Sequence, residues 1–222
     1  MEGSLMNSYD LILFDLDGTL TDPGMGITNS VAYALQKFSI EVSDRRELYK
    51  IIGPPLLDSF RDYYGFTEEE SLLALQYYRE YFADKGIFEN ELYSGVPELL
   101  TKLKTAGISV GLTTSKPEPY ARRILDHFGL TAYFDSITGA TMDEKLSRKA
   151  DIIKVALDKH PDLDLSRIIM AGDREHDVQG ANDNDLKTIG VLYGYGSEEE
   201  LKTAGAAFLV RTPEEILDLC LA

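Results

Sequence analysis

Six short, mostly apolar segments recur along the chain and alternate with longer amphipathic stretches. Most of them have no polar face, as in parallel strands that are covered on both sides. The segments span residues 11–14, 108–112, 136–138, 168–171, 188–192 and 207–210. Strands that alternate with helices in this way predict an α/β fold, in which helices cover both faces of a parallel sheet.

One interval departs from this alternation. Between residues 20 and 85 no clear strand is visible, and apolar side chains repeat at helical spacing, which predicts core-facing helices. The repeats are Val31, Ala34, Leu35 and Phe38, and then Leu72, Leu75, Tyr78 and Phe82. Because the interval directly follows the first strand, it is placed to cover that strand's carboxyl end. We therefore predict an α/β core of residues 1–20 and 86–222, with an all-helical cap of residues 21–85.

The charge of the chain limits its partners. With a formal net charge of −16, the protein would be repelled by nucleic acid polymers and by anionic membranes, so we expect neither. No apolar run reaches the roughly 18 residues of a membrane span, and residues 1–10 do not resemble a secretory signal. Cys220 is the single cysteine and cannot form an internal disulfide. We expect a cytoplasmic monomer or homodimer. Residues 1–5 are either native or a cloning remnant, in which case the chain would start at Met6.

Two carboxylates, Asp15 and Asp17, come directly after the first apolar segment and are followed by Gly18 and Thr19. Acids beside a buried strand are costly unless they bind a cation or react. One carboxylate can attack a phosphate ester, and a second can protonate the leaving alcohol, while a divalent cation offsets their repulsion. Backbone amides at Gly18 and Thr19 could bind phosphate oxygens. The alternative is a solvated acidic turn.

Polar side chains also follow the second apolar segment. Thr114 and Ser115 offer hydroxyls that could hold a phosphate oxygen, although such residues are common in turns. A phosphoryl site further needs a fixed cation to balance its negative charge. The candidates are Lys145, Arg148 and Lys149.

A third group of polar residues follows the segment 168–171. Asp173 and Asp177 are four residues apart, which places both carboxylates on one side of a helical turn. Their hard oxygen ligands suit Mg²⁺. Since ligands of open parallel sheets lie outside the carboxyl ends of the strands, we expect these acids close to Asp15.

The ordered set of these segments resembles the four signature motifs of the haloacid dehalogenase-like hydrolase superfamily. The matching segments are residues 15–19, 114–117, 149–153 and 172–177, and they extend over nearly the whole chain. The resemblance implies a three-layer, Rossmann-like core and a Mg²⁺-dependent phosphatase that forms an aspartyl-phosphate intermediate. Its substrate would be a small phosphorylated metabolite.

The same resemblance implies a role for each matching residue. It makes Asp15 the nucleophile, Asp17 the general acid and base, and Thr114 a ligand of the transferred phosphoryl group. The motif lysine corresponds to Lys149, with Lys145 as the alternative. Mg²⁺ would be held by Asp15, by the backbone carbonyl of Asp17 and by Asp173, with Asp177 mainly in the outer shell.

The helical insert resembles the cap of the phosphoglycolate phosphatase-like branch. Gly53 lies in a segment, residues 52–56, that is similar to the substrate-selecting loop of that branch, and a simple Pro-Pro helix start is the alternative. The lysine motif departs from the Lys-Pro-x-Pro form of the branch, and Asn184 stands where Gly is common. Phosphoglycolate is the first candidate substrate and a nucleoside 5'-monophosphate the second. There are three alternative functions. A sugar-phosphate mutase-type phosphotransferase shares the same motifs, and a non-catalytic module could keep the same fold. A dehalogenase is disfavoured.

Overall fold

The structure is a computed structural model that describes residues 8–221. Met6 and residues 1–5, whose origin the sequence leaves open, lie outside the described residues. Within residues 8–221, no helix has the length and apolar character to cross a bilayer.

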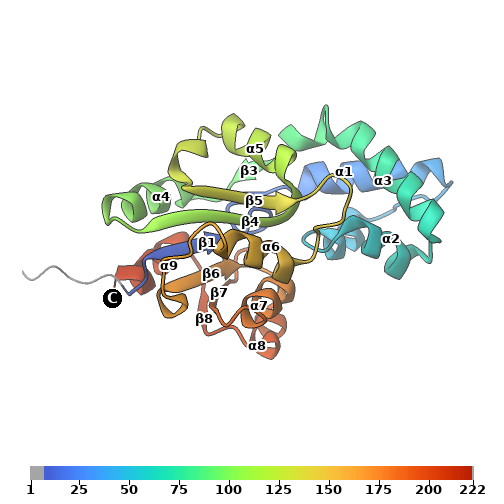
Figure 1. Cartoon of the computed structure of the whole chain (residues 1–222). Helices are drawn as coiled ribbons and strands as arrows, with labels where there is room; N and C mark the ends of the chain where they lie inside the picture. The colour runs from blue at the N-terminus through green and yellow to red at the C-terminus, as the bar shows by residue number, and fades with distance from the viewer. Residues whose placement is uncertain (1–7, 222) are drawn as a thin grey trace, which may run out of the picture.

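A six-stranded parallel sheet forms the centre of the described part of the chain, with the strand order β5-β4-β1-β6-β7-β8 (Figure 1). Each of the six predicted segments is one of its strands, so the predicted α/β fold is confirmed. The strands are β1 (Leu11–Phe14), β4 (Ser109–Pro117), β5 (Ser136–Ala140), β6 (Ile168–Gly172), β7 (Lys187–Val191) and β8 (Phe208–Val210).

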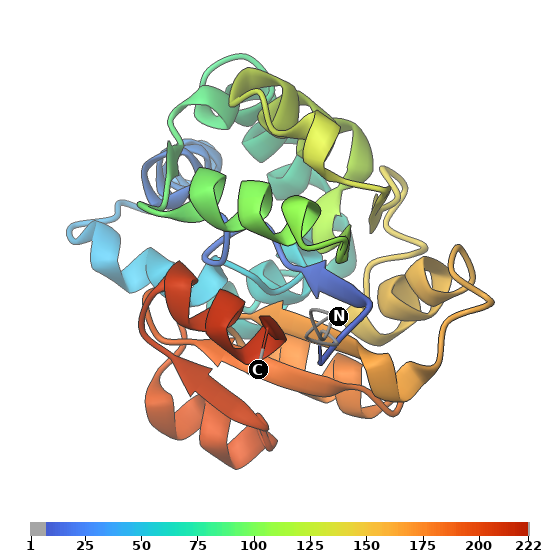
Figure 2. The same ribbon diagram turned by 90° about the vertical axis from the view of Figure 1, so that its left-hand side faces the viewer.

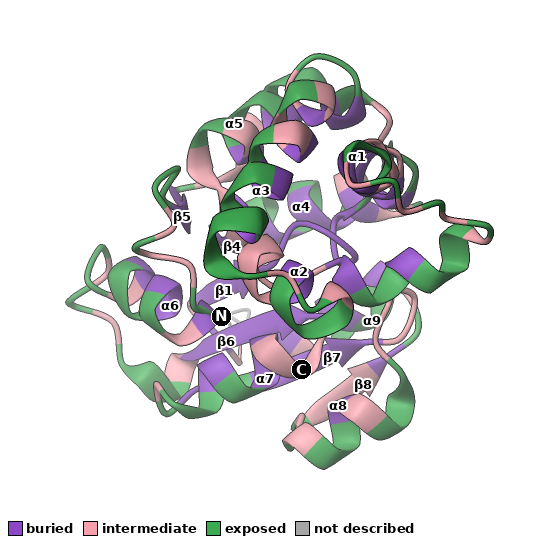
Figure 3. Ribbon diagram, turned by 90° about the vertical axis from the view of Figure 1, so that its right-hand side faces the viewer, coloured by how far each residue is buried: buried purple, intermediate pink, exposed green. Residues whose placement is uncertain are grey.

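Alternating residues of β1 pack against different helical layers. Ile12 and Phe14 join the larger apolar cluster, which includes side chains of α4 (Val96–Thr105), α5 (Glu118–His127) and α9 (Pro213–Leu221). Leu11 and Leu13 join the second cluster with α6 (Lys149–Leu157) and α7 (Glu175–Asn182). Figure 2 shows α9, in red, beside α4, in green. Because both faces are covered, the central strands are almost entirely buried (Figure 3).

Three further short elements belong to the core. Helix α8 (Glu198–Ala204) precedes β8, and its Ser197 cap accepts a hydrogen bond from the backbone N–H of Glu200. Two 3-10 turns, η3 (Thr131–Tyr133) and η4 (Leu165–Arg167), lead into β5 and β6.

An insert made of helices lies between two short antiparallel strands, β2 (Thr21–Asp22) and β3 (Glu91–Leu92). Its elements are α1 (Gly24–Lys37), η1 (Arg45–Ile51), α2 (Leu56–Tyr64), α3 (Glu68–Phe82) and η2 (Gly86–Phe88). They extend over residues 24–88, which we call the helical insert, whereas residues 21–85 were predicted. Strands of two residues are too short to leave a periodic pattern, so β2 and β3 were not predicted.

The apolar stripes of the insert differ at one position from those that the sequence predicts. Leu75, Tyr78 and Phe82 are buried on one side of α3, as expected. Leu72 is 51% exposed, so its predicted place in the core is wrong. The buried side of the first turn of α3 is instead occupied by Ser71, because residues 71, 75, 78 and 82 follow the helical period more closely.

Candidate active site

A tight turn after β1 positions the first two acids. The backbone N–H of Asp15 still donates to Ala171 O on β6 (2.9 Å), and the N–H groups of Leu20 and Thr21 both donate to Leu16 O. Gly18 has φ +90°, and a Cβ atom on it would meet the carboxylate of Asp173. Only glycine therefore lets the chain turn this sharply against the loop after β6.

The sequence predicts that the backbone N–H groups of this turn bind phosphate oxygens, but they already have acceptors. The N–H of Gly18 donates to Thr21 O (2.7 Å), and the N–H of Thr19 points to Leu16 O (3.3 Å). The predicted binding of phosphate oxygens by these two amides is therefore not supported, because the turn itself uses them. The Thr19 hydroxyl is buried without a hydrogen-bond partner among the described residues.

Lys149 is the cation that the fold brings to Asp15. Its Nζ lies 2.5 Å from Asp15 Oδ1 and 2.7 Å from Asp177 Oδ1, and it also donates to Thr113 O (3.0 Å). Burial acts to lower the pKa of Lys149, but the two carboxylates outweigh it and raise that pKa above its ordinary value. The lysine is therefore a fixed positive charge.

Lys145, the alternative, lies elsewhere. Its side chain is 85% exposed and pairs with Asp143 on the surface. The loop between β5 and α6 thus places one lysine in the site and the other in solvent. This placement agrees with the family resemblance, which favours Lys149 over Lys145 as the motif lysine.

Three carboxylates gather at the carboxyl ends of β1 and β6. Oxygens of Asp15, Asp173 and Asp177 lie within 4.8 Å of one another, and all three residues are buried. Asp173 Oδ2 accepts the N–H of Tyr195 (2.8 Å), whereas Asp173 Oδ1 has no partner within residues 8–221. Burial raises the pKa of Asp15 and of Asp173, and the neighbouring acids reinforce this. Such a cluster, with a free buried oxygen, fits a hard divalent cation.

Asp17 faces a different cation. Its Oδ2 lies 2.6 Å from Lys116 Nζ, and both side chains are at most 10% exposed. Its Oδ1 is buried and has no hydrogen-bond partner in the described part of the chain. Lys116 lies in the second matching segment, residues 114–117, but had no predicted role of its own.

Thr114 and Ser115 lie at the carboxyl end of β4, beside β1. Thr114 is buried, and its hydroxyl accepts the N–H of Lys116 (3.2 Å) across a bulge in the strand. Ser115 lines a cavity of about 60 Å³ between the core and the helical insert. Asp17 and Gly53 line the same cavity, so the structure brings the segment around Gly53 close to Asp17, the candidate general acid.

The insert closes this cavity with charged and aromatic side chains. Arg79 of α3 pairs with Glu144 of the core (2.6 Å), and the ring of Phe82 lies over Lys116 Nζ (4.7 Å to its centroid). Tyr78 and Tyr120 complete an aromatic wall. None of these residues was predicted to take part, because nothing in their local sequence distinguishes them from core positions.

The chain is similar to known proteins over most of its length. The family described as haloacid dehalogenase-like hydrolase matches residues 12–191. A 5'-nucleotidase of Pseudomonas aeruginosa is 44% identical over 194 residues, which cover 87% of each chain. The crystal structure of a predicted phosphatase from Clostridium acetobutylicum is 49% identical, with a TM-score of 0.92 over 95% of this chain and 99% of that one.

A further relative carries a different activity in its name. The tyrosine-protein kinase PtkA of Mycobacterium tuberculosis is 40% identical over 190 residues, which cover 85% of this chain and 64% of the kinase. This chain therefore spans less than two thirds of that relative.

Proposed function

Because this chain belongs to the haloacid dehalogenase-like hydrolase family and is a phosphatase of that family, we propose that it is a Mg²⁺-dependent phosphomonoesterase that acts through an aspartyl phosphate. One observation carries the proposal. Asp15 and Asp17 are both buried at the end of β1, and each pairs with a lysine of its own, Lys149 and Lys116. Two acids with separate partners can take separate roles.

In the first step, an oxygen of the Asp15 carboxylate attacks the phosphorus. The bond from phosphorus to the ester oxygen breaks, and Asp17, protonated at this stage, gives its proton to that oxygen, so that an alcohol leaves. Lys149 fixes the attacking carboxylate and balances the charge on the phosphoryl oxygens. Thr114, at the carboxyl end of β4, would donate its hydroxyl to one of those oxygens.

In the second step, Asp17 is a carboxylate and takes a proton from water. The oxygen of that water forms a bond to phosphorus, and the bond between phosphorus and Asp15 breaks. Inorganic phosphate leaves, and Asp15 is restored. The helical insert shields the acyl phosphate from competing acceptors while this happens.

The proposed Mg²⁺ would be held by Asp15 and Asp173, with Asp177 oriented by Lys149 and by the N–H of Arg174. The backbone carbonyl of Asp17 is a further proposed ligand. When bound, the cation would offset the repulsion between the acids and the incoming phosphate.

We propose a nucleoside 5'-monophosphate as the substrate. The wall of the cavity beyond Asp17 includes the aromatic side chains of Tyr78, Phe82 and Tyr120. Both cations there are already paired, Arg79 with Glu144 and Lys116 with Asp17, so the carboxylate of phosphoglycolate would have no free partner. The similarity to a 5'-nucleotidase supports the same choice.

Cavity size favours phosphoglycolate, which is why it stays as the second candidate. A space of about 60 Å³ is far below the roughly 300 Å³ at which pockets for larger ligands begin. A nucleoside would therefore require the insert to move away from the core before binding. Opening and closing of such a lid is common in enzymes that exclude water from the reaction.

The mechanism is tested with Asp15→Asn. We expect this variant to lose turnover of a generic aryl phosphate at saturating Mg²⁺ and to keep the wild-type circular dichroism spectrum. Asp162→Asn, at an exposed acid, is the matched control and should keep full activity. Substantial activity of Asp15→Asn would overturn the mechanism.

The substrate is tested with a panel of phosphate esters at fixed Mg²⁺. A higher kcat/KM for nucleoside 5'-monophosphates than for phosphoglycolate supports the nucleotidase, and the reverse order supports the second candidate. Release of free phosphate in stoichiometric amounts separates hydrolysis from phosphoryl transfer to a sugar or to a tyrosine.

A further inference from the structure

The side chain of Arg174 lies between the core and the helical insert. Arg174 directly follows Asp173, and its Nη1 donates to the backbone carbonyl of Ile52 in the insert (2.5 Å). Only 13% of its side chain is exposed. A guanidinium that donates to a carbonyl in a dry position is a strong and directional contact.

The loop of the insert is shaped to rest on this side chain. Gly53 has φ +105°, and a Cβ atom there would lie 3.0 Å from Arg174 Cγ. The absence of a side chain thus lets the backbone of the loop approach the aliphatic part of the arginine. We call residues 52–55 the substrate loop, because Gly53, Pro54 and Pro55 line the cavity beside Asp17.

Glu200 holds the arginine from the opposite side. Its Oε1 accepts Arg174 Nε (2.8 Å) and also the N–H of Glu175 (2.9 Å). Burial acts to raise the pKa of Glu200, but the hydrogen bonds from Arg174 and Glu175 outweigh it and hold that pKa below its ordinary value. Glu200 therefore stays charged, and it directs Nη1 of the arginine toward the substrate loop.

The backbone of Arg174 is tied to the candidate metal site. Its N–H donates to Asp177 Oδ2 (3.1 Å), and the residue before it is Asp173. Two further arginines also connect the insert to the core, Arg79 with Glu144 and Arg123 with the carbonyl of Ala83. Neither is adjacent in sequence to a residue of the acid cluster.

We propose that Arg174 is a positioning residue that holds the substrate loop against the active site, with Glu200 as its anchor. The position of the loop is then set by the same segment that carries Asp173 and Asp177. A loop held in this way presents its inner surface to the leaving group of the substrate. The contribution to catalysis rests on the proposed function, whereas the contribution to loop position does not.

The first test is amide hydrogen exchange of the metal-free protein without substrate. The N–H of Ile52 donates to Tyr49 O and reports on the start of the substrate loop. Arg174→Gln should make a peptide that spans residues 49–53 exchange about tenfold faster, the effect expected for one charge-assisted hydrogen bond. Glu200→Gln should act in the same direction.

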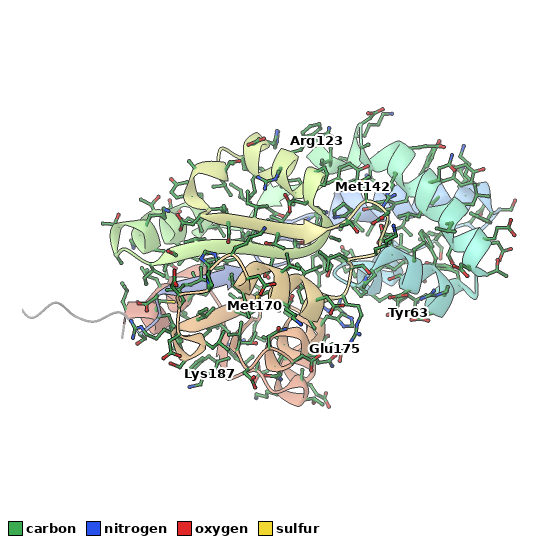
Figure 4. All side chains as sticks on the ribbon, in the orientation of Figure 1. Tyr63, Arg123, Met142, Met170, Glu175 and Lys187 are labelled. Atoms are coloured by element: carbon green, nitrogen blue, oxygen red, sulfur yellow. The ribbon has the colours of Figure 1, made fainter. Side chains whose placement is uncertain are left out.

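Arg123→Gln is the matched control. It also removes an arginine that donates from the core to a carbonyl of the insert, but on α5, on the other side of the sheet from Glu175 (Figure 4). This control should leave exchange at residues 49–53 unchanged. Arg174→Lys keeps the charge but lacks the planar guanidinium, so its exchange rate at residues 49–53 should lie between those of the wild type and Arg174→Gln. It takes the place of Arg174→Gln if that variant does not fold. The proposal would be overturned if Arg174→Lys and Glu200→Gln both exchanged at the wild-type rate. It would also be overturned if Arg123→Gln accelerated exchange at residues 49–53 as much as Arg174→Gln.

The second test is kinetic. Arg174→Gln should raise KM for the best phosphate ester of the panel about tenfold and leave its kcat within a few-fold, because the chemical groups remain in place. A loss confined to kcat would contradict a positioning role. If the wild-type protein hydrolyses no phosphate ester, the proposed function fails, while the exchange experiment still decides the role of Arg174.

Discussion

Lys116 Nζ lies 2.6 Å from Asp17 Oδ2 in a site that also contains the separate pair of Lys149 and Asp15. Because the Lys116 and Asp17 side chains are nearly inaccessible to solvent, removal of the lysine leaves a buried charge without its partner. We expect Lys116→Met to lower the free energy of unfolding by about 3 kcal/mol.

Urea unfolding checks this expectation. The matched control is Lys145→Met, at an exposed lysine, for which we expect a change within about 0.5 kcal/mol. The double variant Lys116→Met with Asp17→Asn should recover part of the loss, because the amide carries no charge. Equal stabilities of the two lysine variants would show that the buried pair contributes nothing.

The two candidates for the motif lysine can be compared in catalysis. Lys149→Met should lower kcat/KM about 10²- to 10³-fold, since it removes the fixed cation beside the attacking carboxylate. Lys145→Met should leave kcat/KM unchanged, because that side chain lies in solvent. Steady-state kinetics on one phosphate ester decide the matter. If Lys145→Met were the damaging change, the assignment of the motif lysine would be wrong.

The metal-free protein should lose stability as the pH rises through neutrality. Burial raises the pKa of Asp15 to about 7, with Lys149 opposing and Asp177 reinforcing the shift. The folded state thus binds this proton more tightly than the unfolded state, whose Asp pKa is about 3.9. The resulting stabilisation is complete below about pH 4 and is lost as the pH rises through 7.

Urea unfolding in EDTA between pH 5 and pH 8 measures this effect. The free energy of unfolding of the wild type should fall relative to that of Asp15→Asn, which cannot titrate at this position. At pH 8, Mg²⁺ at 100 times its Kd should restore about 2.7 kcal/mol to the wild type. Parallel pH curves for the two proteins would mean that Asp15 does not titrate in this range.

Gly18→Ala should damage both stability and metal binding. At φ +90° an alanine is strained by about 1–3 kcal/mol, and its Cβ would also displace the carboxylate of Asp173. Gly129→Ala is the matched control, since Gly129 has φ +68° and open space at its Cβ position. Urea unfolding should show a larger loss for Gly18→Ala. The rise of Tm with Mg²⁺ should disappear in that variant alone, and its persistence would contradict the close packing of Gly18 on Asp173.

Much of the fold and of the acid cluster could be predicted from the order of residues. Strands covered on both faces are mostly apolar, so the six strands were recognisable as short apolar segments between helical stretches. Parallel strands bring their carboxyl ends to one edge, so the acids after β1 and β6 were expected to meet. Asp15, Asp173 and Asp177 do lie together, and the family resemblance on which their roles were based is confirmed.

Further features depended on packing between distant segments. The family resemblance favours Lys149 over Lys145, but it is the fold of the loop after β5 that places Lys149 beside Asp15 and Lys145 in solvent. The amides of Gly18 and Thr19 were expected to face a phosphate, but the turn uses them itself. Leu72 belonged to an apolar repeat and yet faces solvent, because the insert buries a neighbouring stripe of α3.

The sequence by itself thus determined the parallel sheet and the set of acids, because burial and strand polarity are properties of local pattern. Only the tertiary structure decided which cation faces which carboxylate and that Arg174 reaches the carbonyl of Ile52. Those pairings join residues that are far apart in the chain, and their geometry follows from how the helical insert packs on the core. No local pattern encodes a contact of that kind.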